Sequence, residues 1–209
     1  MCIRDSGNYV VGFGHSSGIT RAIRWDTRGQ FINLGVLPGF QSSYSNDVSA
    51  DGSIVVGSCT GGTGSSARSA FVWSATEGMK DAGIAGNNTV FWGLSSDGKV
   101  AVGSDESTNK AIIWDDETKQ TRYLYDYLLT KSIPGFSDWS NLDLTRNISG
   151  TATTGYNIIG SGYYKGQSSS SPFLIRGLTS VPEPSTYILG TFAAGLIAII
   201  GCCSRNTKM

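Results

Sequence analysis

A short pattern occurs four times along the 209 residues: a turn, and then an aliphatic run that ends in glycine. The final glycines stand at positions 12, 57, 103 and 160, so the intervals are 45, 46 and 57 residues. The four copies are Ser6-Gly7-Asn8-Tyr9-Val10-Val11-Gly12, Asp51-Gly52-Ser53-Ile54-Val55-Val56-Gly57, Asp97-Gly98-Lys99-Val100-Ala101-Val102-Gly103 and Thr154-Gly155-Tyr156-Asn157-Ile158-Ile159-Gly160. Similarity at a period of about 40–50 residues is typical of repeat architectures, in which neighbouring units share a core.

A second pattern follows each copy, after a loop rich in glycine and in small polar residues. It reads Ala22-Ile23-Arg24-Trp25, Ala70-Phe71-Val72-Trp73, Ala111-Ile112-Ile113-Trp114 and, more weakly, Pro172-Phe173-Leu174-Ile175. The three tryptophans therefore occupy equivalent positions. We expect their indoles to fill the space between units, because large aromatic rings contribute most of the buried area in such packing. A row of exposed tryptophans that stacks on sugars is the alternative.

The second unit can be divided into four short strands, at about 45–49, 53–58, 69–74 and 78–83. Asp51-Gly52 lies between the first two, and Asp-Gly between aliphatic runs is a strong hairpin signal because glycine tolerates the positive φ of a tight turn. Four short strands in about 40–50 residues correspond to one blade of a β-propeller. The sequence therefore predicts an all-β fold, a propeller-like array of about four four-stranded repeats.

The repeats define a β-domain at 7–177, with units at about 7–35, 45–83, 91–124 and 146–176. The third interval is longer because residues 124–143 insert a polar and aromatic segment. The first six residues do not resemble a secretory leader, which needs a basic and then an apolar stretch. We expect residues 1–6 to be a non-native start, and the chain to be a fragment whose leader lies upstream.

Composition excludes some classes of function. The 16 basic and 16 acidic residues give no net charge, so the basic footprint of a nucleic-acid binder is missing. The four cysteines, Cys2, Cys59, Cys202 and Cys203, show neither metal-type spacing nor a disulfide framework. The single histidine, His15, lies in a glycine- and serine-rich segment with no evident partner to orient it. The sequence thus indicates no catalytic, metal-binding or cofactor-binding residue, and we expect a protein that is not an enzyme.

Asp51 and Asp97 precede glycine at equivalent turns. We expect their carboxylates to accept hydrogen bonds from backbone N–H groups of these turns. Calcium is the competing explanation, but the spaced series of oxygen ligands of a calcium loop is missing from the sequence.

The order of these patterns resembles the HAF family of bacterial extracellular repeats, over about residues 6–175. The similarity is greatest where Asp51-Gly52 and its aliphatic run precede Ala70-Phe71-Val72-Trp73 and Gly78-Met79-Lys80-Asp81. Phe31 replaces methionine in the first unit, and the fourth unit lacks tryptophan. The resemblance implies an extracellular, propeller-like module of undefined activity, and it carries over no catalytic residue.

The character of the sequence changes after the last repeat. Residues 178–185 form a linker in which Pro182 and Pro184 favour extended backbone. A run without charge follows from Tyr187 to Cys203. The sequence predicts a transmembrane helix at 186–203, and at 1.5 Å per residue its length of ~25 Å is just sufficient to span a bilayer. The tail at 204–209 contains Arg205 and Lys208, cations that favour the cytoplasmic side.

The C-terminal segment as a whole resembles the PEP-CTERM sorting signal, with Pro182-Glu183-Pro184, a short apolar helix and a basic end in that order. The resemblance implies export in a Gram-negative bacterium and recognition by an exosortase, a protease that removes the tail. The implied recognition residues are Pro182, Glu183 and Pro184. The protein would be anchored transiently in the inner membrane and would then reach the cell surface or the medium.

Together these features predict an exported, non-enzymatic adhesion or scaffold module of the cell surface or extracellular matrix. The alternative is a secreted propeller that binds or modifies carbohydrate, with an extracellular polysaccharide as its partner. Fold alone does not decide between them, because one β-architecture supports many functions.

Overall fold

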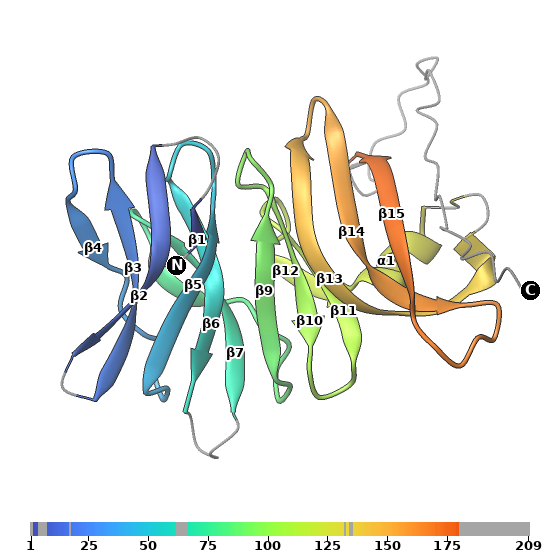
Figure 1. Cartoon of the computed structure of the whole chain (residues 1–209), viewed down its shortest axis with the longest axis horizontal. Coiled ribbons are helices and arrows are strands. Elements are labelled where there is room, and N and C mark those ends of the chain that lie inside the picture. The colour runs from blue at the N-terminus through green and yellow to red at the C-terminus, as the bar shows by residue number, and fades with distance from the viewer. Residues whose placement is uncertain are drawn as a thin grey trace, which may run out of the picture.

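The computed structural model describes residues 2–3, 8–16, 18–61, 67–131, 133 and 136–179. These residues form four antiparallel sheets, which lie side by side in a row (Figure 1). Sheet A contains β1 (Cys2–Ile3), β2 (Tyr9–Ser16), β3 (Ile19–Asp26) and β4 (Phe31–Asn33). Sheet B contains β5 (Ser42–Val48), β6 (Ile54–Thr60), β7 (Arg68–Ser74) and β8 (Gly78–Asp81). Sheet C contains β9 (Thr89–Leu94), β10 (Val100–Asp105), β11 (Lys110–Asp115) and β12 (Gln120–Tyr123), and sheet D contains β13 (Trp139–Thr151), β14 (Gly155–Tyr164) and β15 (Ser171–Leu178).

Each sheet is one sequence repeat, built as a meander in which consecutive strands pair. The four strands of sheet B lie within a few residues of the ranges predicted for the second unit. The turns follow the chemistry expected of them, since Gly52, Gly98 and Gly155 have φ values of 71°, 71° and 76°. This left-handed region is open to glycine at little cost. The all-β prediction is therefore confirmed.

The glycine that ends the aliphatic run in sheets B, C and D has a packing reason. A Cβ atom added at Gly57, Gly103 or Gly160 would collide with the backbone carbonyl oxygen of Tyr44, Val90 or Leu144, respectively. Each of these oxygens belongs to the strand before the turn. Only a residue without a side chain lets the two strands approach closely at this point.

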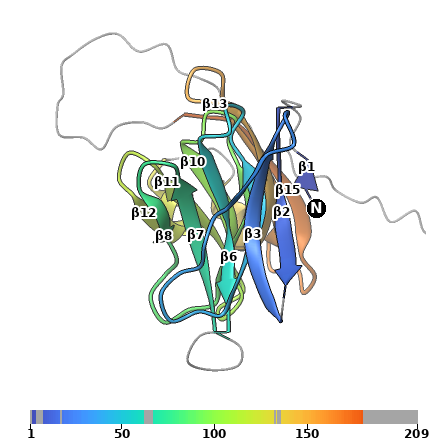
Figure 2. The same cartoon turned by 90° about the vertical axis from the view of Figure 1, so that its left-hand side faces the viewer.

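The core consists of three apolar clusters, and each fills the space between two neighbouring sheets. One cluster joins sheets A and B, including Val11, Val55 and Trp73. The second joins sheets B and C, including Val56, Phe91 and Trp114. The third joins sheets C and D together with the short helices α1 (Leu124–Leu129) and η1 (Phe136–Asp138). Sheets A and D lie at the two ends of the row, and Figure 2 shows the row from the end formed by sheet A.

The last unit differs from its prediction. Sheet D contains three strands in the described residues instead of four. Its first strand begins at Trp139, although residues 124–143 had been predicted as an insertion and the unit was expected to begin near 146. The reason is that Trp139 and Leu142 are buried in the same cluster as Ile148, so the apolar surface of the sheet extends into that segment. The inserted segment also forms α1, which the sequence patterns did not predict.

Two predictions concern the ends of the chain. Cys2–Ile3 pairs with Val10 and Val11 of β2, so part of the segment expected as a non-native start forms the edge strand of sheet A. Within the described residues no helix is long and apolar enough to cross a membrane. The helix predicted at 186–203 lies outside those residues.

Candidate functional site

A groove of about 500 Å³ runs between sheets B and C, beside their last strands. Ile54, Val72 and Trp114 form its apolar part. Trp114 is only 2% exposed, so the groove offers no free indole ring for stacking. Small-molecule sites are commonly concave, with apolar walls and a few polar groups that orient the ligand.

The rim of this groove carries charges of both signs. Lys80, Glu77 and Asp81 come from β8 and the turn before it, whereas Asp116 and Lys119 come from the turn between β11 and β12. Lys119 forms an ion pair with Asp116, and its Nζ lies 5.7 Å from the centre of the Trp114 ring. Such a rim can hydrogen-bond a neutral polar ligand, such as the hydroxyl groups of a sugar.

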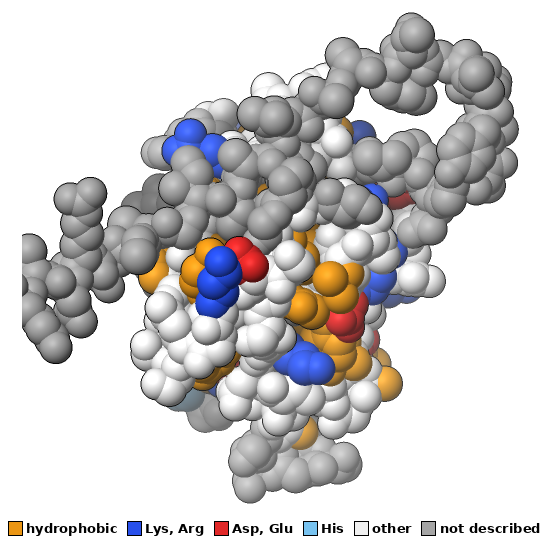
Figure 3. All heavy atoms as spheres, turned by 90° about the vertical axis from the view of Figure 1, so that its right-hand side faces the viewer, with side chains coloured by type: hydrophobic (Ala, Val, Ile, Leu, Met, Phe, Trp, Pro, Cys, Tyr) orange, Lys and Arg blue, Asp and Glu red, His pale blue; other side chains and the backbone are white. Residues whose placement is uncertain are grey.

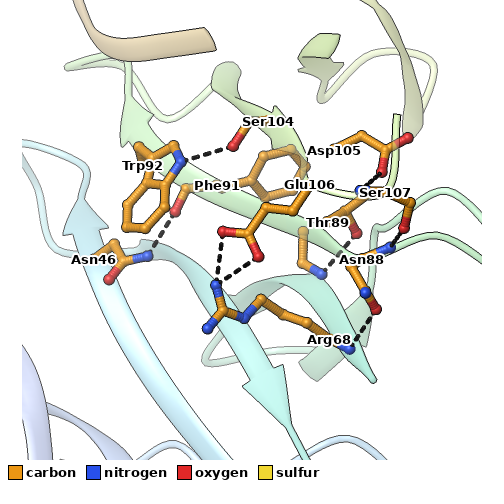
Figure 4. A network of polar contacts seen from close by, with 11 residues as sticks. Asn46, Arg68, Asn88, Thr89, Phe91, Trp92, Ser104, Asp105, Glu106 and Ser107 are labelled. Atoms are coloured by element: carbon orange, nitrogen blue, oxygen red, sulfur yellow. Dashed lines mark hydrogen bonds and ion pairs between the residues drawn. The ribbon is translucent and has the colours of Figure 1, made fainter. Parts of the chain in front are cut away.

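A second polar region lies at the other end of the same two sheets (Figure 4). The Arg68 guanidinium donates to both carboxylate oxygens of Glu106, at 2.9 and 3.0 Å. Backbone groups continue the connection, because Ala70 N donates to the Thr89 hydroxyl at 3.1 Å and the Asn46 amide donates to the Phe91 carbonyl at 2.8 Å. These contacts join the two sheets to each other, and we assign them a structural role.

Bulged residues form a row that the sequence patterns did not reveal. The first strands of sheets B and C each shift register at one point and that of sheet D at three, and at equivalent points Asn46, Trp92 and Arg146 are the extra residues. The Arg146 guanidinium lies 6.0 Å from the centre of the Trp92 ring, and the Trp92 indole N–H donates to the Ser104 hydroxyl at 3.0 Å. A bulge inserts one extra residue and shifts the alternation after it by one position, as the burial pattern of β5 shows. In strands this short, the sequence alone does not distinguish such a shift from an irregular position.

The equivalent tryptophans do not form an exposed row. Trp73 and Trp114 are buried at 6% and 2% exposure in the clusters between sheets, which confirms the core prediction for both. Trp25 is half-buried, on sheet A. The alternative prediction, a row of exposed tryptophans that stacks on sugars, is therefore wrong for Trp73 and Trp114.

The predicted turn carboxylates accept backbone N–H groups. Asp51 accepts from Ser53 N at 3.0 Å, and Asp97 accepts from Lys99 N at 3.2 Å. Hydrogen bonds from Ser49 and Ser53 lower the pKa of Asp51 despite its partial burial. Among the described residues, no group of three or more His, Cys, Asp or Glu side chains could hold a metal ion.

Asp105 is the most buried carboxylate of this region. It accepts hydrogen bonds from Asn87, Thr108 and Tyr123, at 2.7, 2.6 and 3.0 Å, and from Ser107 N at 2.9 Å. Burial alone would raise the pKa of Asp105, but these donors lower it. A carboxylate that is ionised and fully hydrogen-bonded is suited to holding a loop and unsuited to proton transfer.

His15 and Cys59 have simple environments. His15 Nδ1 lies 3.1 Å from the Thr20 hydroxyl on the neighbouring strand, and its side chain is exposed. Cys59 is a free, buried cysteine, and burial raises the pKa of its thiol to about 11. Neither side chain lies in an arrangement suited to nucleophilic catalysis.

The comparisons with known proteins concern mainly the end of the chain. Residues 180–206 match the PEP-CTERM protein-sorting motif. This match confirms the predicted sorting signal and includes Pro182, Glu183 and Pro184, which lie outside the described residues. The motif identifies an exported protein that is sorted at the membrane by an exosortase. The HAF-type repeats stay a prediction.

No curated protein matches the chain. Among solved structures, the crystal structure of TolB from Acinetobacter baumannii is similar at 11% sequence identity and a TM-score of 0.46. That similarity covers 80% of this chain and 38% of the TolB chain. The chain therefore spans well under half the length of this solved protein.

Proposed function

We propose that this chain is a non-enzymatic adhesion or scaffold module, carried to the cell surface by its sorting signal and released from the membrane by an exosortase. The match to the sorting motif over residues 180–206 carries this proposal. A signal of this kind serves to place the preceding part of the chain outside the inner membrane.

The β-domain supports the adhesion role through its construction. Its buried carboxylate, Asp105, is hydrogen-bonded, and its sheets are joined by apolar clusters. A rigid array of sheets offers a large, stable surface, which is the property that an adhesion or scaffold module requires.

The sorting step is tested with the full chain in a host that has an exosortase. The mature protein should lose the predicted helix at 186–203 and leave the membrane fraction. Glu183→Ala removes the central recognition residue, so this variant should stay in the membrane with its C-terminus complete. Mass spectrometry of the surface protein distinguishes the two forms, and a deletion of the exosortase serves as the control. An intact wild-type C-terminus through Met209 in such a host would make the segment a permanent tail anchor.

The adhesion step needs a separate measurement. Cells that lack the protein should attach to surfaces and to each other less well, and wild-type protein should restore attachment. The Glu183→Ala protein, retained in the membrane, should restore less. Unchanged attachment after deletion, with normal sorting of the wild type, would reject the adhesion role and leave the sorting route standing.

A second candidate function is carbohydrate binding, and the groove between sheets B and C is the observation that favours it. Lys80 and Lys119 stand on the rim of that groove and can donate to sugar hydroxyl groups. If the groove binds polysaccharide, the double variant Lys80→Ala, Lys119→Ala should bind at least about tenfold more weakly in affinity electrophoresis. Lys165→Ala is the matched control, because Lys165 lies in the turn after β14, outside the groove, and pairs with Asp138. Equal binding by both variants would exclude the groove.

A further inference from the structure

The two ends of the row present sheet faces of different composition. On sheet A, Val11 and Ala22 are fully buried against sheet B. Side chains of successive strand residues point to opposite faces, so Val10 and Ile23 face away from sheet B. Trp25 shares this outer face, because it pairs directly with Val10 and with Phe31. Phe31 is 62% exposed.

The positions of this outer face are core positions in the next two sheets. The residue equivalent to Trp25 is Trp73 in sheet B, where sheet A covers it, and Trp114 in sheet C, where sheet B covers it. Val10 corresponds in the same way to Val55 and Ala101, both fully buried. Wherever a sheet precedes, this face is interior. On sheet A, in the part of the chain that the structure describes, Val10, Ile23 and Trp25 belong to none of the three core clusters.

At the other end of the row, the outer face of sheet D is the one that points away from sheet C. Ile158 and Phe173 are buried against sheet C, so Ile159 and Leu174 face outward. These two residues are paired directly across β14 and β15. Ile159 is 46% exposed and Leu174 is half-buried. Figure 3, which views the molecule from this end, shows hydrophobic side chains gathered between charged ones.

The residues equivalent to Ile159 and Leu174 are also core residues in the interior of the row. Val56 and Val72 of sheet B lie in the cluster that contains Trp114. Val102 and Ile113 of sheet C lie in the cluster shared with sheet D. In sheet A, Arg24 takes the place of Leu174, and its guanidinium lies 5.3 Å from the centre of the Trp73 ring. Each interface between neighbouring sheets thus sets this pair of positions against the next sheet. In two of the three interfaces, that sheet has tryptophan at the position equivalent to Trp25, namely Trp73 and Trp114, and sheet D has Ile175 there.

We propose that the outer face of sheet D binds the outer face of sheet A on a second copy of this chain. Ile159 and Leu174 of one copy would cover Trp25 and Phe31 of the next. This contact would repeat the packed interface between sheets B and C. A second copy is the partner we infer, because each copy of the chain has both of the faces that such an interface needs. The two faces differ, so the contact is head-to-tail and leaves one free end of each kind. This association goes beyond the proposed function and does not depend on sorting.

Sedimentation velocity of the full chain in one detergent tests the proposal. The wild type should form oligomers that grow with protein concentration. Phe31→Asp blocks the sheet A face and Ile159→Lys blocks the sheet D face, so each variant alone should stay monomeric. A mixture of the two variants still has one intact face of each kind. The mixture should therefore give dimers and no larger species.

Three controls separate this contact from other effects. The double variant Phe31→Asp, Ile159→Lys gives the baseline for association through the C-terminal segment. Phe31→Leu and Ile159→Val keep both faces apolar and should assemble as the wild type does. Leu129→Lys places a charge on α1 at a residue of similar exposure, 53%, and should not affect assembly. Circular dichroism and thermal unfolding show that each variant is folded.

Three results would overturn the proposal. One is a wild type that matches the double variant at every concentration. Another is loss of assembly with Phe31→Asp but not with Ile159→Lys, because that result means that like faces meet. The third is a mixture of the two single variants that stays monomeric.

Discussion

Asp97 and Tyr156 join two neighbouring sheets, since the Tyr156 hydroxyl donates to the Asp97 carboxylate at 3.2 Å. The same carboxylate accepts from Ala152 N at 2.8 Å. Asp97 lies in the turn between β9 and β10, whereas both donors belong to the hairpin of sheet D. One side chain therefore closes its own turn and holds the next sheet in place.

Asp97→Asn should destabilise the protein more than Asp51→Asn. The two carboxylates close equivalent turns, and Asp51 accepts hydrogen bonds from Ser49 and Ser53 of its own turn. The difference between the variants therefore reports the contacts of Asp97 with Ala152 and Tyr156. We expect a difference of about 1–3 kcal/mol in the free energy of unfolding, because an amide has one acceptor oxygen where the carboxylate has two, so a partly buried donor loses its acceptor. Urea unfolding followed by tryptophan fluorescence measures it, and equal losses would show that the sheets do not depend on this contact.

The stability of the β-domain should fall in acid. Burial alone would raise the pKa of Asp97, but hydrogen bonds from Ser95, Ala152, Lys99 and Tyr156 lower it below the ordinary value of 3.8. The pKa values of Asp51 and Asp105 are lowered as well. A carboxyl whose pKa is lower in the folded state contributes stability above its unfolded pKa and loses that contribution as the pH falls through its folded pKa.

This linkage predicts little change in the melting temperature between pH 7 and pH 5, and a progressive fall below about pH 4. Differential scanning calorimetry across this range measures it. The fall should be smaller in Asp97→Asn, which has lost one of the titrating groups. A stability that rises on acidification would contradict the assignment.

The two tryptophans predicted and found in the core should respond differently from Trp25. Trp73→Ala and Trp114→Ala remove buried indoles, so each should cost about 3–5 kcal/mol. Trp25→Ala should cost clearly less, because its indole is half-buried on the outer face of sheet A. The measurements belong in the Ile159→Lys background, which blocks the proposed contact between copies and leaves sheet A unchanged. Equal losses at all three positions would mean that another part of the protein covers Trp25.

The sequence patterns predicted the elements that depend on neighbours in the chain. Asp51-Gly52 and Asp97-Gly98 identified two hairpin turns, and the aliphatic runs identified β6 and β10. The predictions from these features are correct because turn chemistry and strand alternation depend on residues close together in the sequence. The sorting signal was predicted for the same reason, since its order of residues is linear.

Features that depend on distant residues were missed. The contacts of the bulged residues, Asn46 with the Phe91 carbonyl and Arg146 with Trp92, form only after the sheets have stacked. The groove beside Trp114 likewise needs the turn at Asp116 and the edge of sheet B to come together. The start of β13 was misplaced because Trp139 and Leu142 show their role only through burial against α1 and sheet C. The spacing between such residues along the chain carries no information about these contacts.

The glycine at the end of the aliphatic run in sheets B, C and D should be the least replaceable residue of its repeat. A methyl group at Gly103 would collide with the carbonyl group of Val90 and with the Cα atom of Phe91, all of them backbone atoms of the paired strand. Backbone cannot move aside as a flexible side chain can, so we expect Gly103→Ala to cost at least about 3 kcal/mol, the upper end of the range for overpacking. The matched control is Gly86→Ala. Gly86 has a φ of 80° with nothing within 4 Å of an added Cβ, so only backbone strain of about 1–2 kcal/mol should appear there. Thermal unfolding of the two variants gives the comparison. A Gly103→Ala protein that melts with the wild type would show that β9 and β10 can separate at this point, and that the repeated glycine has another cause.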